Sequence, residues 1–121
     1  MRCFNCKHNY LNPALTQEII NKIYSQEYYA TEDDNLCIQK FEEWFLDPEG
    51  YYQITLKWLL KYLGLRDTKI LEIGCGTGCF LAECAKYGAE VMGIDPSPKA
   101  IELAQKYYGM TLIRGYLESV E

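Results

Sequence analysis

Hydrophobic residues in the first half of the chain recur at helical spacing. Residues 16–24 are expected to form a short helix, with Thr16 as its N-cap and Glu18 near the positive helix end. A second helix is predicted after the acidic run at 32–34, which is typical of a solvated loop. The apolar positions of this second helix fall on one stripe, which is expected to be buried: Cys37, Phe41, Trp44 and Phe45.

A third helix is predicted after Asp47-Pro48-Glu49, which offers a cap, a proline for the first helical position and an acidic first turn. Gly64 is expected to end this helix. Its buried face would consist of Tyr52, Leu56, Leu59, Leu60 and Leu63. Residues 13–66 are therefore interpreted as a helical cover that precedes the rest of the chain.

Beyond Gly64 the pattern alternates between strands and helices. Short apolar runs predict strands at 69–73, 90–94 and 110–113. One helix is predicted at 79–87 and is stopped by Gly88. The other is capped by Ser97 and ended by Gly109. Its inward residues would be Ala100, Ile101, Ala104 and Tyr108.

Strands joined by crossover helices imply a parallel sheet with right-handed connections. The predicted fold class is therefore α/β, a doubly wound sheet with about three strands. The third strand is expected on one side, the second in the middle and the first on the other side. Strand 69–73 would then be an edge whose apolar residues and unpaired main-chain groups favour self-association.

The strongest functional signal is the glycine-rich turn that follows the first strand. Residues 70–78 read Ile-Leu-Glu-Ile-Gly-Cys-Gly-Thr-Gly, directly ahead of a predicted helix. Gly74 and Gly76 reach the backbone angles of a tight turn cheaply and let a ligand approach the main chain. The helix N-terminus adds unpaired N–H groups and a positive dipole end, which suit a carboxylate or a phosphate.

The absence of a glycine at one position and the presence of two acidic residues narrow the choice of ligand. A dinucleotide fingerprint would have its third glycine at position 79, where this chain has Cys79. Glu72 ends a strand that is expected to be buried, so its carboxylate is costly unless a cation or a donor answers it. It would repel a pyrophosphate and attract an ammonium or a sulfonium. Asp95 follows about 20 residues after the first glycine, where a carboxylate can hold both hydroxyls of a ribose.

Residues 72–78 and 93–97 resemble the first and second motifs of class I S-adenosylmethionine (SAM)-dependent methyltransferases, and the resemblance extends over roughly 69–118. It implies a Rossmann-like fold with SAM as cofactor. Glu72 would face the amino group of SAM, Asp95 would hold the ribose hydroxyls and Pro96 would flank the adenine. The turn that lines the methionine part would consist of Gly74, Cys75, Gly76, Thr77 and Gly78.

Two further features bear on the adenine and on the cover of the cofactor. The family usually has Gly-Asp-small-Glu after the third strand, and its Asp holds the adenine amino group, whereas this chain has Tyr116 in that place. We therefore expect the adenine to rely on main-chain groups near Leu117. Tyrosines of the amino-terminal helices either pack in the core or cap the cofactor, as the helices ahead of the SAM domain do in similar proteins. These are Tyr28, Tyr29, Tyr51 and Tyr52.

The amino-terminal stretch, with its Cys-x-x-Cys at Cys3 and Cys6, resembles the region ahead of the SAM domain in methyltransferases that begin with a small zinc ribbon. In those proteins two such knuckles bind one zinc ion. Residues 1–12 are thus interpreted as the remnant of one knuckle, a half-site, or alternatively as free thiols. Tetrahedral zinc needs four ligands, so zinc binds only if His8 and another group supply the missing ones.

Charge and composition limit the partners. The net charge of −5 and the pI near 4.9 disfavour nucleic acid, because phosphate binding needs clustered Lys and Arg. No apolar run of roughly eighteen residues and no basic-then-apolar leader is found, so we expect neither a membrane span nor a secretory signal. The expected location is therefore cytoplasmic.

The sequence thus predicts a methyltransferase that moves a methyl group from SAM to a small-molecule or sugar-like acceptor. Residues 67–121 would form the N-terminal half of its SAM domain, and the chain is expected to be truncated at both ends, because such a sheet needs strands beyond the third. No catalytic residue is predicted. A non-catalytic SAM-binding module and an NAD-dependent oxidoreductase remain open as alternatives.

Overall fold

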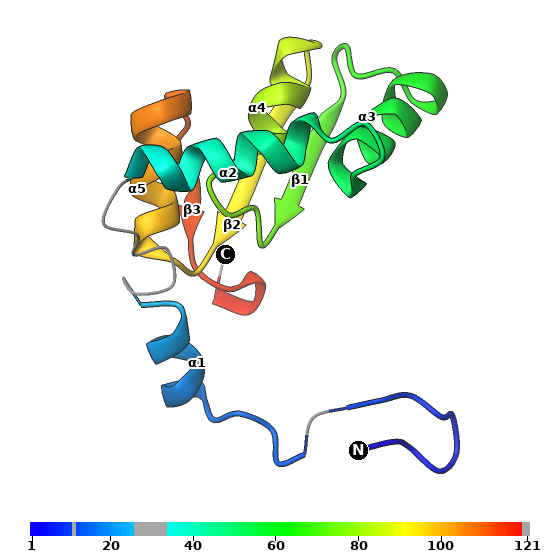
Figure 1. Cartoon of the computed structure of the whole chain (residues 1–121), viewed down its shortest axis with the longest axis vertical. Coiled ribbons are helices and arrows are strands. Elements are labelled where there is room, and N and C mark those ends of the chain that lie inside the picture. Colours follow the sequence, from blue (N-terminus) through cyan, green and yellow to red (C-terminus); the bar gives the residue numbers. More distant parts are fainter. Residues whose placement is uncertain (11, 26–33, 120–121) are drawn as a thin grey trace.

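A three-stranded parallel sheet with helices packed on it forms the second half of the computed structural model (Figure 1). The structure describes residues 1–10, 12–25 and 34–119, without the side chains of 34–37, 41 and 119. The helices are α1 (Gln17–Ile23), α2 (Asp34–Leu46), α3 (Tyr51–Tyr62), α4 (Cys79–Lys86) and α5 (Pro98–Tyr108). The strands are β1 (Lys69–Ile73), β2 (Glu90–Asp95) and β3 (Ile113–Arg114), and Leu117–Ser119 form a 3₁₀ turn.

The predicted α/β fold and strand order are confirmed. The strands stand in the order β1-β2-β3, and both pairs are parallel. Glu72 of β1 lies opposite Gly93 of β2, and Ile73 lies opposite Ile94. The carboxyl ends of the strands therefore meet at one edge of the sheet, where ligands of doubly wound folds bind. No helix in the described part of the chain is long and apolar enough to span a bilayer.

Local capping signals predict most of the helix ends correctly. Thr16 and Ser97 each accept a hydrogen bond from a main-chain N–H three residues further on, at 3.4 and 3.3 Å. The glycines that follow α3, α4 and α5 all adopt the left-handed conformation that ends a helix: Gly64, Gly88 and Gly109. These signals are reliable because each one involves only neighbouring residues.

The predicted start of α3 is wrong. The helix begins at Tyr51, and Gly50 is its N-cap. Asp47 forms a turn instead: its Oδ1 accepts from the N–H of Glu49 at 3.0 Å, and its carbonyl oxygen accepts from the N–H of Gly50 at 2.9 Å. The aspartate side chain thus bonds to the main chain two residues on, which competes with its use as a helix cap.

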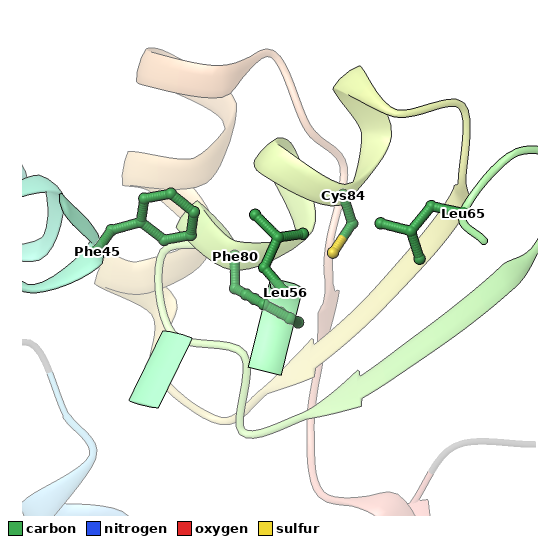
Figure 2. Close-up of a cluster of buried hydrophobic side chains, with 5 residues drawn as sticks. All are labelled: Phe45, Leu56, Leu65, Phe80 and Cys84. Atoms are coloured by element: carbon green, nitrogen blue, oxygen red, sulfur yellow. The ribbon is translucent and has the colours of Figure 1, made fainter. Parts of the chain in front are cut away.

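The main core cluster joins three helices to the sheet (Figure 2). Phe45 comes from α2, Leu56 from α3, and Phe80 and Cys84 from α4, while Leu65 precedes β1. The ring of Tyr52 lies against this cluster, with its centroid 5.8 Å from that of Phe80. A second cluster, formed by Cys75, Leu81, Ala104 and Leu112, packs the glycine-rich turn between α4 and α5.

The buried faces of α2 and α3 differ from the predicted ones. Phe45 is buried, but Trp44 is 60% exposed and Ile38 is buried in its place. Ile38 packs against Leu103 of α5, a contact that the spacing within α2 does not reveal. Leu63 is 61% exposed because it follows the end of α3. The side chains of Cys37 and Phe41 lie outside the described part of the chain.

The expectation that strand 69–73 is buried is wrong for one of its faces. Ile70 and Val91 pack against the main core cluster. On the opposite face Leu71, Ile73 and Met92 are each more than half exposed. Side chains of a strand alternate between the two faces, so helices that cover only one face leave every second side chain in contact with water.

The third strand is shorter and later than predicted. Only Ile113 and Arg114 pair with β2, whereas 110–113 was expected. After Gly109 the chain still completes the cap of α5, since the N–H of Met110 donates to the carbonyl oxygen of Ala104 at 3.3 Å. Leu112 then turns into the second core cluster and is buried. The apolar run therefore ends a helix and fills the core before it forms a strand.

Candidate functional site

The glycine-rich turn lies between β1 and α4 and is held against β2 by its main chain. The N–H groups of Gly74 and Cys75 both donate to the carbonyl oxygen of Ile94, at 2.8 and 3.2 Å. Gly74 has a φ of +73°, and a Cβ added to it would meet no atom within 4 Å. The turn therefore needs glycine for its conformation and leaves open space beside the main chain, where a ligand can approach.

Asp95 ties the turn to the end of β2. Its Oδ2 accepts from the N–H of Gly76 at 2.8 Å, and its Oδ1 accepts from the N–H of Ser97 at 2.9 Å. The residue is buried, with 4% of its surface exposed. Each carboxylate oxygen has a second lone pair and can accept a further hydrogen bond. Asp95 thus fixes the turn, and its contact to a ribose stays a prediction.

Glu72 brings a partly buried carboxylate to the end of β1. Its Oε2 is buried and has no hydrogen-bond partner in the described part of the chain. Burial, and after it the charge of Asp95, raises the pKa of Glu72 to about 7. Burial also raises the pKa of Tyr52, and the charge of Glu72 adds to this effect. A cationic group that reached this carboxylate would offset the cost of its burial.

Two hollows meet at Gly74. The smaller, of about 80 Å³, is lined by Tyr52, Gly74, Cys75, Gly76, Thr77, Cys79 and Phe80. The larger, of about 350 Å³, is lined by Tyr24, Ile73, Gly74, Ile94, Pro96, Gly115, Tyr116, Leu117 and Glu118. We call the two together the cleft. It brings the predicted turn residues together with Pro96 and Leu117, whereas Glu72, Gly78 and Asp95 do not line it.

The tyrosines that line the cleft were only partly predicted. Tyr52 borders the smaller hollow and also packs against the main core cluster, so both alternatives for it stay open. Tyr51 is 77% exposed and lines neither hollow. Tyr28 and Tyr29 lie outside the described residues. Tyr24, which borders the larger hollow, was missed because nothing in its local sequence distinguishes it from other helix-end tyrosines.

Gly93 lies in the second motif that the sequence analysis singled out, but no role was predicted for it. It lies in β2 opposite Glu72, and a Cβ added to it would lie 2.6 Å from Cys75 Sγ and 2.7 Å from Leu81 Cδ1. Glycine is required here by close approach, because no side chain fits between β2 and the turn. An isolated glycine inside a predicted strand is the signal that points to such a position.

The Cys3 and Cys6 pair forms a tight turn at the amino terminus. The N–H of Cys3 donates to the carbonyl oxygen of His8 at 2.7 Å, and Lys7 between them has a φ of +64°. The main-chain N–H of Cys6 lowers the pKa of the Cys3 thiol. Among the described residues no three His, Cys, Asp or Glu side chains are grouped so as to hold a metal ion. The resemblance to a zinc ribbon is therefore not supported by the structure.

Comparisons of the chain with known proteins agree with the resemblance to methyltransferases that the glycine-rich turn indicated. Residues 70–121 match the family described as methyltransferase domain. The chain is 35% identical over 86 residues to ubiquinone biosynthesis O-methyltransferase of Azoarcus sp. (strain BH72), which covers 62% of this chain and 36% of that protein. It is 44% identical over 64 residues to EEF1A lysine methyltransferase 2 of Homo sapiens. That match covers 52% of this chain and 26% of the human protein. These matched stretches span only about a third of the relatives' own length or less.

Solved structures share the fold. Magnesium protoporphyrin IX methyltransferase of Synechocystis PCC 6803 with bound SAM has a TM-score of 0.58 at 20% identity, over 92% of this chain and 60% of that one. A TehB-like SAM-dependent methyltransferase of Corynebacterium glutamicum has a TM-score of 0.52 at 23% identity, over 73% of this chain and 47% of that one. At such low identity these likenesses establish the architecture alone.

The parallel sheet, with the glycine-rich turn at the carboxyl end of β1, defines a Rossmann-like fold. Residues 70–121 are similar to methyltransferase domains. This similarity favours the methyltransferase over the NAD-dependent oxidoreductase that the sequence left open.

Proposed function

We propose that the cleft binds SAM and that the whole protein transfers its methyl group to a small-molecule or sugar-like acceptor. The observation that carries the proposal is the buried carboxylate of Glu72, whose Oε2 has no hydrogen-bond partner among the described residues. SAM carries an ammonium and a sulfonium, so it offers a positive charge that can pair with this carboxylate. The open space beside Gly74 gives it access to the main chain.

The residues of the chain would divide the cofactor between them. Glu72 would hold the ammonium directly or through a water molecule, and the turn at 74–78 would surround the methionine part. Asp95 would accept from the ribose hydroxyls with the lone pairs that Gly76 and Ser97 leave free. Pro96 and Leu117, which line the larger hollow, would enclose the adenine.

Bound SAM would supply an activated methyl group: the acceptor takes it in line from the sulfonium, and a neutral thioether is the leaving group. The protein then contributes mainly orientation and the exclusion of water. A general base is needed only if the acceptor still carries its proton. The names of the relatives include both a ubiquinone biosynthesis enzyme and a protein lysine methyltransferase, so they do not discriminate between acceptors. The acidic net charge disfavours a nucleic-acid acceptor.

Calorimetry with SAM, with its demethylated product and with NAD tests the cofactor. We expect SAM and its product to bind and NAD not to bind. Gly76→Val should abolish binding, because Gly76 has a φ of +55° and its main chain would face the ligand. The matched control is Gly109→Val, which changes a glycine of similar φ, +64°, at the end of α5. Binding of NAD without SAM, or normal SAM binding by Gly76→Val, would contradict the proposal.

A further inference from the structure

One hydrogen bond joins two parts of the chain that are far apart in sequence. The hydroxyl of Tyr116, in the segment after β3, donates to Oδ1 of Asn21 on α1 at 3.2 Å. Figure 1 shows α1 beyond the carboxyl ends of β1 and β2. Tyr24, which follows α1, lines the larger hollow of the cleft. The bond therefore connects a helix ahead of the methyltransferase domain to the rim of the candidate cofactor site.

Tyr116 and Tyr24 line both the cleft and a second hollow, as Pro96 and Gly115 also do. Both side chains line the larger hollow of the cleft, of about 350 Å³. Both also line a neighbouring hollow of about 590 Å³, whose wall includes Asn21 and Arg114. The end of α1 and the segment after β3 thus form a common wall on the side of the cleft where Pro96 and Leu117 lie.

The position of α1 depends on such contacts. The helix has only 7 residues and buries none of them. Helices this short are not stable in water by themselves, so α1 needs contacts with the rest of the protein to keep its place. The hydrogen bond from Tyr116 to Asn21 is one such contact.

We propose that Tyr116 is a positioning residue that holds α1 over the adenine side of the cleft through Asn21. The inference rests on the proposed function, since it assumes that SAM occupies the cleft. Tyr116 forms part of the wall, and its hydroxyl would fix the helix that Tyr24 follows.

Two variants and one control test this role by calorimetry with SAM and with methylthioadenosine, which keeps the adenine and ribose but lacks the amino acid. Tyr116→Phe keeps the ring and removes the hydroxyl, and Asn21→Ala removes the acceptor. Each should raise the dissociation constant for both ligands by about three- to tenfold, as expected for the loss of this exposed hydrogen bond. The double variant should be no weaker than either single one, because both remove the same bond.

Gln17→Ala is the matched control. The side-chain amide of Gln17 donates to the same Oδ1 of Asn21 at 2.9 Å. Both residues of this bond belong to α1, so the bond does not connect the helix to the cleft and Gln17→Ala should bind SAM normally. Hydrogen exchange supplies a readout beyond affinity: SAM should protect the amides of 17–23 in the wild type and not in Tyr116→Phe. Normal affinity in both variants, or strictly additive losses, overturns the inference alone. If the wild type does not bind SAM, the proposed function fails and the inference fails with it.

Discussion

Replacing Glu72 with glutamine should stabilise the unliganded protein at pH 8 and at the same time weaken its binding of SAM. The pKa of Glu72 is raised from 4.5 to about 7, chiefly by burial and further by Asp95. Below pH 4.5 the carboxyl group is protonated in both the folded and the unfolded protein. Between the two values only the folded protein holds the proton, so the free energy of unfolding falls as the pH rises, and it levels off above about 7.

The size of the effect follows from the two pKa values. Each pH unit between them changes the free energy of unfolding by about 1.4 kcal/mol, which gives at most about 3 kcal/mol. Glu72 is partly open to water, and solvent screening reduces the expected cost of its charge to about 1–3 kcal/mol. Glutamine has nearly the same shape and no charge, so Glu72→Gln should recover about this amount at pH 8 and almost none near pH 4.5.

Urea unfolding followed by circular dichroism, at pH 5 and at pH 8, measures this difference. Glu90→Gln is the control, because Glu90 is an exposed residue of β2 whose side chain lies 3.6 Å from Lys69 and is 73% exposed. It should change the stability little at either pH. If Glu72→Gln shows the same pH dependence as the wild type, the carboxylate is not buried in the way that the structure implies.

Calorimetry on the same variant should give the opposite sign. Without the carboxylate, SAM loses a charge-assisted hydrogen bond, and its dissociation constant should rise by about 10- to 100-fold at pH 8. A variant that is more stable and binds more weakly would identify Glu72 as a ligand-binding group. Unchanged affinity would remove Glu72 from the cofactor site while leaving the stability argument intact.

Three further predictions concern the turn, the sheet and its edge. Asp95→Ala should weaken SAM binding by about 1.5–3 kcal/mol in calorimetry, because the ribose contact is lost and the N–H groups of Gly76 and Ser97 lose their acceptor. Unchanged affinity would exclude Asp95 from the cofactor site. Gly93→Ala should lower the free energy of unfolding in urea by about 1–3 kcal/mol, since the new Cβ would lie 2.6 Å from Cys75 Sγ, and wild-type stability would contradict this packing. The chain should self-associate weakly through β1, which pairs only with β2 among the described strands. Sedimentation velocity at rising concentration tests this, and a monomer at high micromolar concentration would refute it.

Features that depend on a few neighbouring residues were predictable from the sequence. The caps at Thr16 and Ser97 and the helix-ending glycine at Gly109 are such features, and so is the turn that begins at Gly74. Their conformations follow from side-chain oxygens close to the main chain or from backbone angles that only glycine reaches cheaply. The alternation of strands and helices then restricts the sheet to a parallel arrangement with few choices of order.

Features that depend on distant partners were not predictable. Trp44 has the right spacing for a buried stripe, but Ile38 is buried because Leu103 of α5 lies beside it. Leu112 lies in an apolar run that favours a strand, yet it fills the core around Cys75. Nothing local identifies which of several apolar residues will meet a partner from another element. The contact between Tyr116 and Asn21 is of the same kind, since the two residues are 95 positions apart.

The parallel register between β1 and β2 brings the glycine-rich turn and the two acidic residues of the candidate site together. It places Glu72 opposite Gly93, and the missing side chain of Gly93 lets Cys75 fold down onto β2. The same arrangement brings Asp95 close enough to raise the pKa of both Glu72 and Cys75, after the larger effect of burial. Two acidic groups are therefore held near each other and partly out of water, which costs stability in the unliganded protein. A cationic ligand would recover that cost on binding, so under the proposed function the features that destabilise the unliganded site are the ones that would favour SAM.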